Sequence, residues 1–247
     1  MSAAQAQTCI VLAGGLGTRL RSAVAELPKC LAPVGQRSFL DIQLQSLFAA
    51  GVDEIVLSLG YKADAVVAAV AHNWTGRPVR HVVEPALLGT GGAIAFAMDT
   101  LGLAEVLVAN GDTYLDGDIS AMLAPLRRAD GELFRMATVT VPDRARFGGV
   151  QSNAAGRVER FLEKGQQGAG AINAGLYRLC RAALPAGRSG AYSLEADVLP
   201  GLVAAGAVTA LPVAGSFIDI GVPDDYFRFC AQHSAEHRAQ HSAPHGG

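Results

Sequence analysis

A short apolar run that breaks into a glycine-rich loop constrains this chain more than any other feature. Residues 8–13, Thr-Cys-Ile-Val-Leu-Ala, are long enough for a buried strand and too short for a helix. The segment Gly14-Gly15-Leu16-Gly17-Thr18-Arg19 follows at once. Glycines accept positive φ values and let a ligand approach the main chain, so backbone N–H groups there can point at phosphate oxygens. The stretch therefore predicts a strand followed by a phosphate-binding loop.

Two basic residues strengthen this interpretation. Arg19 brings a fixed cation with a planar fork, and Lys29, behind Pro28, brings a compact one. The chain has only three lysines, so the presence of one close behind the glycine-rich loop favours a functional role for it. Together they predict a site for a nucleoside triphosphate. The structural alternative is a tight strand-to-helix turn with a surface arginine.

Two common phosphate loops are excluded. A P-loop requires G-x-x-x-x-G-K-[ST], and no such string occurs. A dinucleotide fingerprint requires G-x-G-x-x-G, and the third glycine position after Gly15 and Gly17 holds Leu20. The loop must therefore serve another kind of nucleotide site.

Composition narrows the class of protein. The chain has 247 residues, half of them apolar, with 29 glycines, which suits a buried parallel sheet covered by helices. A formal net charge of −2 argues against a nucleic-acid partner. No apolar run approaches the length of a membrane span, and residues 1–7 lack the pattern of a signal peptide. We expect a soluble cytoplasmic protein whose scattered cysteines, with no C-x-x-C pair, are ordinary buried thiols.

The order of the elements predicts an α/β fold. In the first half, strands alternate with helices, which indicates a mostly parallel sheet with ligands at the carboxyl ends of its strands. The strands are expected at 8–13, 54–59, 79–83 and 104–109, and the helices at 39–51, 62–72 and up to 100. Strands then dominate, at 133–141, 149–152, 157–163, 171–179, 207–213 and 216–220, with a hairpin at 153–156 and helices at 193–206 and 223–237. We expect a single domain over 1–230, with a nucleotide half at about 1–130, an acceptor half at about 131–230, and a polar C-terminal tail at 231–247.

Two aspartates are candidate ligands of a metal ion. Asp112 follows an apolar strand within Asn110-Gly-Asp112, and Asp219 lies inside the apolar string Phe217-Ile-Asp-Ile-Gly221. A charge inside an apolar strand is costly unless it is paired or bound to metal. Mg²⁺ prefers oxygen ligands, so the two carboxylates could share one ion. Asp112 could also be an ordinary turn aspartate.

Glu84 is the candidate reader of the nucleotide base. A carboxylate only accepts hydrogen bonds, and guanine offers two adjacent donors, N1–H and N2–H₂, whereas the other bases present a mixed edge. Glu84 therefore favours GTP. A surface glutamate or a contact to ribose is the alternative. The nearby glycines Gly89, Gly91 and Gly92 are expected to let the main chain pack against the base.

These motifs resemble the sugar-1-phosphate nucleotidyltransferase family, over nearly the whole chain. The resemblance lies in G-G-x-G-T-R-L followed by P-K, and in the order of the later motifs. Leu88-Gly-Thr-Gly-Gly, Ser193-Leu-Glu and Phe217-Ile-Asp-Ile-Gly-Val-Pro are most similar to the D-glycero-α-D-manno-heptose-1-phosphate guanylyltransferases. Residues 22–27 lack the usual Pro-Leu-Thr, and Cys30-Leu31 replaces Pro-Met or Pro-Leu.

The resemblance implies a Rossmann-like three-layer fold with a small β-rich acceptor lobe, and transfer of a nucleotidyl group, GMP in the favoured interpretation, from a nucleoside triphosphate to a sugar 1-phosphate. It implies catalytic roles for Arg19, Lys29, Asp112 and Lys164, and a Mg²⁺ held by Asp112 and Asp219. The implied nucleotide-binding residues are Leu12, Ala13, Gly14, Gly15, Gly17, Thr18, Glu84, Gly89 and Thr90. The implied sugar-phosphate-binding residues are Gly149, Glu163, Lys164 and Asn173.

Several alternatives stay open at this point. The acceptor could be mannose 1-phosphate or another sugar 1-phosphate, with GTP replaced by another nucleotide. A regulatory subunit that binds sugar nucleotides commonly loses a metal carboxylate or a loop cation, yet all are present here. A Rossmann-type oxidoreductase is disfavoured by Leu20. An interface of a homodimer could involve Trp74.

Two further features are interpreted structurally. Ser193-Leu-Glu195 is taken as a helix N-cap with an acid in the first turn, although the acid could instead face the acceptor. Histidines recur every four residues at the C-terminus and could chelate a metal on a helix, but a disordered polar tail is preferred. They are His233, His237, His241 and His245.

Overall fold

The computed structural model describes residues 6–17, 20, 24, 27–241, with the side chains of 234–241 excluded. The expected contacts of Thr18 and Arg19 therefore lie outside the described residues.

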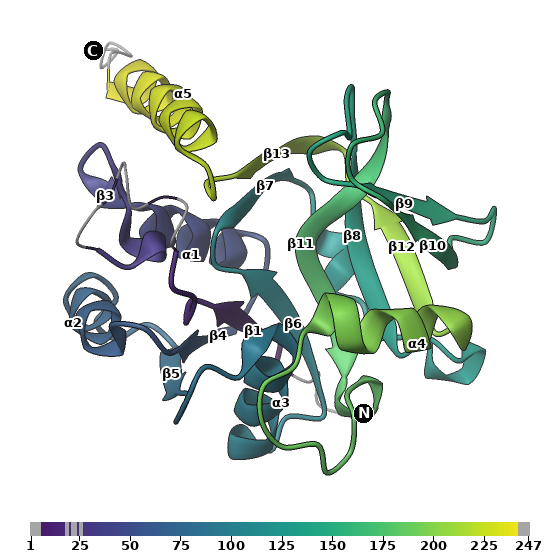
Figure 1. The fold of residues 1–247 in the computed structure, drawn as a ribbon. Helices are drawn as coiled ribbons and strands as arrows, with labels where there is room; N and C mark the ends of the chain where they lie inside the picture. Colours follow the sequence, from purple (N-terminus) through teal and green to yellow (C-terminus); the bar gives the residue numbers. More distant parts are fainter. Residues whose placement is uncertain (1–5, 18–19, 21–23, 25–26, 242–247) are drawn as a thin grey trace.

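A seven-stranded sheet forms the centre of the molecule (Figure 1). Strand β11 is antiparallel to both of its neighbours, β6 and β8, whereas every other pairing in this sheet is parallel. The expectation of a mostly parallel sheet is confirmed. In spatial order the strands are β12 (Val208–Pro212), β8 (Phe134–Val141), β11 (Gly170–Cys180), β6 (Glu105–Asn110), β1 (Thr8–Leu12), β4 (Glu54–Leu59) and β5 (Val79–Val83).

Helices cover both faces of the sheet and make three layers. Helices α1 (Phe39–Ala49) and α2 (Ala63–Asn73) pack on one face, and α3 (Gly89–Leu101) and α4 (Leu199–Ala204) pack on the other. In β1, Cys9 and Val11 face the first layer and Ile10 faces the second, as the alternation of side chains along a strand requires. A capping box fixes the start of α1, since Ser38 Oγ accepts the N–H of Asp41 and the Asp41 carboxylate accepts the N–H of Ser38.

Three two-stranded ribbons, β9 with β10, β7 with β13 and β2 with β3, lie outside the central sheet. The predicted hairpin is confirmed, because the N–H of Gly156 donates to the carbonyl of Asn153 at 2.9 Å between two antiparallel strands. β7 and β13 form a further two-stranded ribbon, of which only β13 was predicted from the sequence. The bounds are β9 (Gly149–Ser152), β10 (Val158–Leu162), β7 (Thr113–Gly117), β13 (Gly215–Asp219), β2 (Pro33–Val34) and β3 (Arg37–Ser38).

Short helices differ in detail from the expectations. The helix expected from Ser193 to Gly206 is divided into a π-helix, η6 (Leu194–Val198), and α4, with Pro200 in the first turn of α4. Proline is tolerated there because the first-turn N–H groups have no intrahelical acceptor. The 3₁₀ helices are η2 (Lys29–Leu31), η3 (Ser120–Leu123), η4 (Arg128–Asp130) and η5 (Arg181–Ala183).

Helix α5 (Pro223–His241) lies at the upper left in Figure 1. It ends four residues beyond the predicted end at residue 237. His233, His237 and His241 therefore lie in a helix, and the expectation of a disordered tail is wrong as far as His241. His245 lies outside the described residues.

Two remaining expectations concern thiols and membranes. Cys9, Cys30 and Cys180 are buried and Cys230 is partly buried, and all are free thiols, as expected. Among the described residues, no helix is both long enough and apolar enough to cross a membrane.

Candidate functional site

A cavity of about 530 Å³ opens at the carboxyl ends of β1 and β6. The end of a parallel strand is where α/β sheets bind ligands, because the loops diverge there. The lining residues come from the glycine-rich loop, from the start of α3 and from the turn after β6. They are Leu12, Ala13, Gly14, Gly15, Leu16, Gly17, Lys29, Cys30, Glu84, Leu87, Gly89, Thr90, Ala93, Asn110, Gly111, Asp112 and Gly221.

The glycines of the loop are required by close packing. A methyl group added to Gly14 would lie 2.7 Å from Glu84 Oε1 and 2.9 Å from the backbone nitrogen of Gly60. Gly17 has φ of 58°, and a methyl group there would lie 2.9 Å from the Cβ of Lys29. Side chains at these positions would displace the glutamate and the lysine that the loop supports. The structure therefore brings the predicted nucleotide-binding residues together in one wall, apart from Thr18, which lies outside the described residues.

Lys29 lies between the two predicted metal aspartates. Its Nζ is 2.6 Å from Asp112 Oδ2 and 3.8 Å from Asp219 Oδ1. The lysine side chain is largely buried, at 11% exposure. Opposite charges at these distances attract strongly because water screens them only on the open side. One cation thus joins the carboxyl end of β6 to that of β13.

The ribbon of β7 and β13 fixes this geometry. Asp219 pairs with Thr113, and the N–H of Ile220 donates to the carbonyl of Asp112 at 3.0 Å. The N–H of Gly221 donates to Asp219 Oδ1 at 2.6 Å, and a methyl group on Gly221 would lie 2.9 Å from Lys29 Nζ. Asp112 and Asp219, which are over a hundred residues apart in the sequence, therefore lie beside each other as predicted.

The aspartate pair fits a hard divalent cation. Carboxylate oxygens are suitable ligands, and both carboxylates already face one positive charge, that of Lys29. Among the described residues, no group of three or more His, Cys, Asp or Glu side chains could hold a metal ion by itself. A metal bound here would need further oxygen atoms from substrate or water.

Glu84 forms part of the cavity wall and is half-buried. Its Oε2 accepts the N–H of Leu88 at 3.0 Å, and its Oε1 lies 3.4 Å from the hydroxyl of Ser58. Burial raises the pKa of the Glu84 carboxyl, although the hydrogen bonds of Leu88 and Ser58 oppose that shift. The carboxylate is thus placed beside the nucleotide cavity, and its reading of a base stays a prediction.

The glycines after Glu84 have a different partner from the expected one. The N–H groups of Gly91 and Gly92 donate to the carbonyl of Tyr192 at 3.0 and 3.3 Å. A methyl group on Gly91 would collide with the Tyr192 ring. Neither glycine is among the residues that line the cavity. The contact of Gly91 and Gly92 with the base stays a prediction, whereas Gly89, with φ of 68°, lines the cavity.

The predicted acceptor residues are not among those that line this cavity. Glu163 and Lys164 follow β10 and are exposed, without a hydrogen bond or ion pair to their side chains in the described part of the chain. Asn173 Nδ2 donates to the Tyr177 hydroxyl at 2.8 Å, and its Oδ1 accepts the N–H of Gly175. Their contact with a sugar phosphate stays a prediction.

Gly149 is buried beneath neighbouring side chains. A methyl group there would lie 2.8 Å from Arg144 Nη1 and 3.0 Å from Leu162 Cδ1. The preceding Gly148, with φ of 74°, is the glycine beside the side chain of Lys164, where an added methyl group would lie 3.7 Å from Cγ. The need for glycine at 149 therefore has a packing explanation, and its contact with a sugar stays a prediction.

Sequence reasoning missed several supporting residues. Gln43 is buried in α1, and its Nε2 donates to the carbonyls of Asn110 and Thr113 at 2.8 and 2.9 Å, which holds the turn that carries Asp112. A glutamine on the apolar face of α1 was the available signal. Arg146 Nη2 lies 2.5 Å from Asp225 Oδ2, which ties the β8–β9 turn to the start of α5.

Trp74, the expected interface residue, has partners within the chain. Its Nε1 donates to Asp41 Oδ1 at 2.8 Å, and its ring packs on Phe48 with centroids 5.6 Å apart. Trp74 thus joins α2 to α1, and the homodimer stays a prediction.

Comparison with known proteins gives a consistent group of relatives. The model of a family described as nucleotidyl transferase matches residues 8–236. The chain is 34% identical over 218 residues to a D-glycero-alpha-D-manno-heptose 1-phosphate guanylyltransferase of Aneurinibacillus thermoaerophilus, covering 88% of this chain and 94% of that one. It is 32% identical over 223 residues to the enzyme of the same name from Campylobacter jejuni, covering 89% and 97%. The crystal structure of HddC from Yersinia pseudotuberculosis complexed with GMP-PN superposes with a TM-score of 0.81 and 33% identity, covering 92% of this chain and 99% of that one.

Proposed function

Because the chain belongs to the nucleotidyl transferase family of enzymes, we propose that it transfers a guanylyl group from GTP to D-glycero-α-D-manno-heptose 1-phosphate. The products are a GDP-heptose and pyrophosphate. The observation that carries this proposal is the Lys29, Asp112 and Asp219 cluster at the end of the nucleotide cavity. The names of the relatives support the heptose and guanylyl assignments.

The reaction joins two anions, so its main demands are alignment and charge neutralisation. A phosphate oxygen of the sugar 1-phosphate attacks the α-phosphorus, and the bond from that phosphorus to the bridging oxygen breaks as pyrophosphate leaves. Lys29, which lines the cavity, supplies positive charge to the triphosphate. Arg19 is proposed to act beside it, and Lys164 to hold the phosphate of the acceptor.

We propose Mg²⁺ as the metal of the site, with Asp112 and Asp219 as its protein ligands. When bound, it would neutralise developing charge on the phosphate oxygens. The chain contributes two carboxylates at the ends of β6 and β13, held in position by the β7–β13 ribbon and by Gln43.

Glu84 is proposed to favour guanine because its carboxylate can accept from the two adjacent donors of that base. Its place in the cavity wall, close to the glycine-rich loop, supports this role. The binding of GMP-PN by HddC, to which this chain is 33% identical, also supports a guanine nucleotide.

A matrix of nucleoside triphosphates against sugar 1-phosphates tests the proposal directly. GTP, ATP, UTP, CTP and dTTP are each combined with heptose, mannose, glucose and galactose 1-phosphates, and the product is identified by its mass. We expect the highest kcat/KM for GTP with the heptose. Turnover of another pair in preference would refute the substrate assignment, and no turnover in any combination would refute the activity.

A further inference from the structure

Glu195 lies in the π-helix η6, directly before α4. Ser193 is the N-cap of this turn, since its Oγ accepts the N–H of Ala196 at 3.1 Å, which confirms the N-cap interpretation. π-Helical turns are rare and occur frequently at functional sites. The turn places Glu195 at a junction between the two halves of the molecule, because η6 packs against α3.

The carboxylate of Glu195 reaches the nucleotide cavity through one hydrogen bond. Its Oε2 accepts the hydroxyl of Thr90 at 2.7 Å, and Thr90 lines the cavity. The same Thr90 oxygen accepts the N–H of Leu194 at 2.8 Å, so Thr90 is bonded both to the backbone of η6 and to the side chain of Glu195. Glu195 is therefore fixed next to the wall in which the nucleotide is proposed to bind.

Glu195 also lies close to the acceptor group. The buried hydroxyl of Tyr177 accepts from Asn173 Nδ2 at 2.8 Å. Burial raises the pKa of this hydroxyl, and the negative charge of Glu195 is the next largest contribution, with a smaller one from Asp112. The charge of Glu195 thus acts on the hydroxyl that is bonded to the predicted acceptor residue Asn173. The carboxylate is therefore bonded to a residue of the nucleotide wall and acts electrostatically on the partner of Asn173.

The carboxylate retains capacity to bind a ligand. Its Oε2 also accepts the hydroxyl of Ser193 at 3.0 Å, whereas in the described part of the chain no hydrogen bond reaches Oε1. Glu195 is exposed and forms no ion pair with any described lysine or arginine. A carboxylate is an acceptor only, and the groups of a sugar that it can bind are hydroxyls.

From this placement we propose that Glu195 binds hydroxyl groups of the acceptor sugar and helps to determine which sugar is used. The inference rests on the proposed function, because it assumes a sugar 1-phosphate as acceptor. Glu195 comes from η6, whereas the other predicted acceptor residues come from the β9–β10 hairpin and β11. The bond from Glu195 to Thr90 then connects the sugar to the nucleotide wall.

The test compares the effect of Glu195 variants on the KM for the sugar 1-phosphate with their effect on the KM for GTP. Removal of a hydrogen bond from a charged group to a hydroxyl costs roughly 10–100-fold in binding. We expect Glu195→Ala to raise the KM for the sugar 1-phosphate by about that factor, while the KM for GTP changes by less than about twofold. Glu195→Gln keeps an oxygen for Thr90 but loses the charge, and it should give an intermediate rise.

Monodeoxy analogues identify the hydroxyl. A series of mannose 1-phosphates, each lacking one hydroxyl, is assayed with wild-type protein and with Glu195→Ala. For the analogue that lacks the hydroxyl bound by Glu195, the ratio of the two kcat/KM values should fall close to one, because two changes that remove the same interaction do not add. A constant ratio across the series would overturn the proposal.

Two further variants separate sugar binding from a structural role. Asp197→Asn alters the neighbouring carboxylate of η6, whose Oδ2 accepts the N–H of Ser193, and should leave both KM values unchanged. Thr90→Val cuts the bond to Glu195 but leaves the carboxylate in place, so it should affect the sugar less than Glu195→Ala does. If Thr90→Val and Glu195→Ala raise both KM values equally, Glu195 only holds Thr90 and the proposal is wrong. Absence of turnover by wild-type protein with every sugar would instead overturn the proposed function, and this inference with it.

Discussion

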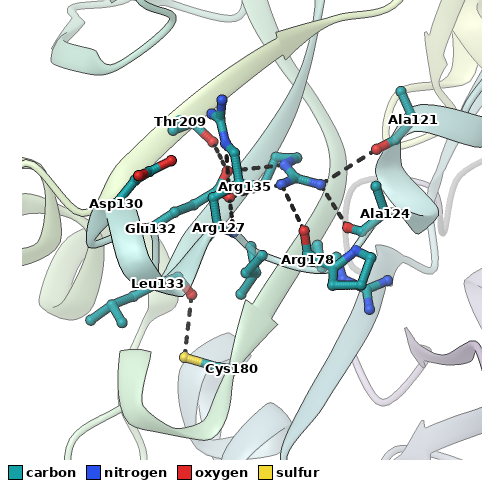
Figure 2. Close-up of polar contacts among 12 residues, drawn as sticks. Ala121, Ala124, Arg127, Asp130, Glu132, Leu133, Arg135, Arg178, Cys180 and Thr209 are labelled. Atoms are coloured by element: carbon teal, nitrogen blue, oxygen red, sulfur yellow. Dashed lines mark hydrogen bonds and ion pairs between the residues drawn. The ribbon is translucent and has the colours of Figure 1, made fainter. Parts of the chain in front are cut away.

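Two clusters, each made of acidic and basic side chains, lie at opposite ends of the central sheet. They differ in how many of their charged atoms have a hydrogen-bond or ion-pair partner. The edge cluster (Lys29, Asp112 and Asp219) lies at the carboxyl ends of β6 and β13, and its members Lys29 and Asp112 line the cavity. The buried cluster, centred on Glu132 and Arg135, lies at the start of β8, away from that cavity (Figure 2).

In the buried cluster, every polar group has a partner. Glu132 is fully buried, and its oxygens accept from Arg135 Nε and Nη2 at 3.0 and 2.7 Å and from the N–H of Arg127 at 2.6 Å. The hydroxyl of Thr209 also donates to it. Arg135 Nη1 in turn donates to the carbonyl of Ala124 at 2.7 Å. A cluster whose donors and acceptors are all paired in this way stabilises the fold, but it has no donor or acceptor left to bind a ligand.

In the edge cluster, the charges remain partly unsatisfied. Asp112 and Asp219 have side chains with 36% and 23% exposure, and Lys29 makes one short and one long contact to them. Unused oxygen atoms that face a cavity can bind a metal ion or phosphates. The contrast separates a charge cluster that retains capacity for a ligand from one whose charges are all paired.

The largest expected effect is on stability in the buried cluster. Glu132→Ala leaves the guanidinium of Arg135 buried without its counter-ion, and loss of one partner of a buried pair typically costs about 3–5 kcal/mol. Urea unfolding should show this decrease in the free energy of unfolding, while kcat per folded molecule is retained. A decrease below about 1 kcal/mol would contradict the structural role.

In the edge cluster, the expected effect is on activity. Asp112→Asn removes one charge from the cavity and should lower kcat by roughly 10²–10³-fold, in line with loss of one transition-state contact. The free energy of unfolding should change little. Asp118→Asn is the matched control, because that exposed carboxylate only accepts the N–H of Ser120. Retained turnover in Asp112→Asn would remove this residue from the mechanism.

The two clusters should also differ in their response to acid. Hydrogen bonds from Arg135, Arg127 and Thr209 lower the pKa of Glu132 from its ordinary 4.5 to about 2, although burial opposes this shift. Because the pKa is lowered, the ionised Glu132 carboxylate contributes to the free energy of unfolding above pH about 4.5. This contribution is lost as the pH falls to about 2. This contribution is about 3 kcal/mol. Unfolding of wild-type protein and Glu132→Gln at several pH values should show the difference between them shrinking over that window.

Removal of Lys29 should open the edge cluster to metal. In the absence of nucleotide the ammonium group competes with any divalent cation for Asp112 and Asp219. Lys29→Met should therefore bind Mn²⁺ about tenfold more tightly without nucleotide, as measured from the free Mn²⁺ signal by electron paramagnetic resonance. Lys62→Met, which removes an exposed lysine near Tyr61, should leave this affinity unchanged. Equal affinities in wild-type and Lys29→Met would show that the lysine does not block the site.

The smallest effect is expected for an exposed pair with similar geometry. Arg80 Nε lies 2.7 Å from Glu54 Oε1 and its Nη2 lies 2.8 Å from Oε2, but the arginine side chain has 48% exposure. Arg80→Ala should destabilise the protein by less than about 1 kcal/mol, because water screens the pair. A loss comparable to that of Glu132→Ala would show that burial does not explain the difference between the clusters.

Local signals in the sequence were sufficient for much of the fold. The strands expected at 54–59 and 79–83 coincide with β4 and β5, and the helix expected from residue 39 begins there as α1. These elements are determined by neighbouring residues, through the alternation of side chains and the capping of the first turn. The position of the cavity was also predictable, because ligands bind at the carboxyl ends of parallel strands, and the family resemblance supplied part of its lining.

Features that depend on distant partners were not predictable in this way. The need for glycine at 91 comes from Tyr192, about a hundred residues later, and the full saturation of Glu132 requires Thr209. Lys62 adopts a left-handed conformation with φ of 53° at the start of α2, and no property of lysine indicates this. Such details follow from tertiary packing, which a single sequence does not display.

The antiparallel strand β11 makes the two halves of the chain depend on each other during folding. It separates β6 from β8 in the sheet, and residues 170–180 must therefore be synthesised before β6 acquires its second neighbour. A chain that stops near residue 130 would carry an open strand edge, which can pair with other chains. The nascent protein consequently passes through a stage prone to aggregation, and the sheet closes only when the acceptor half inserts its longest strand.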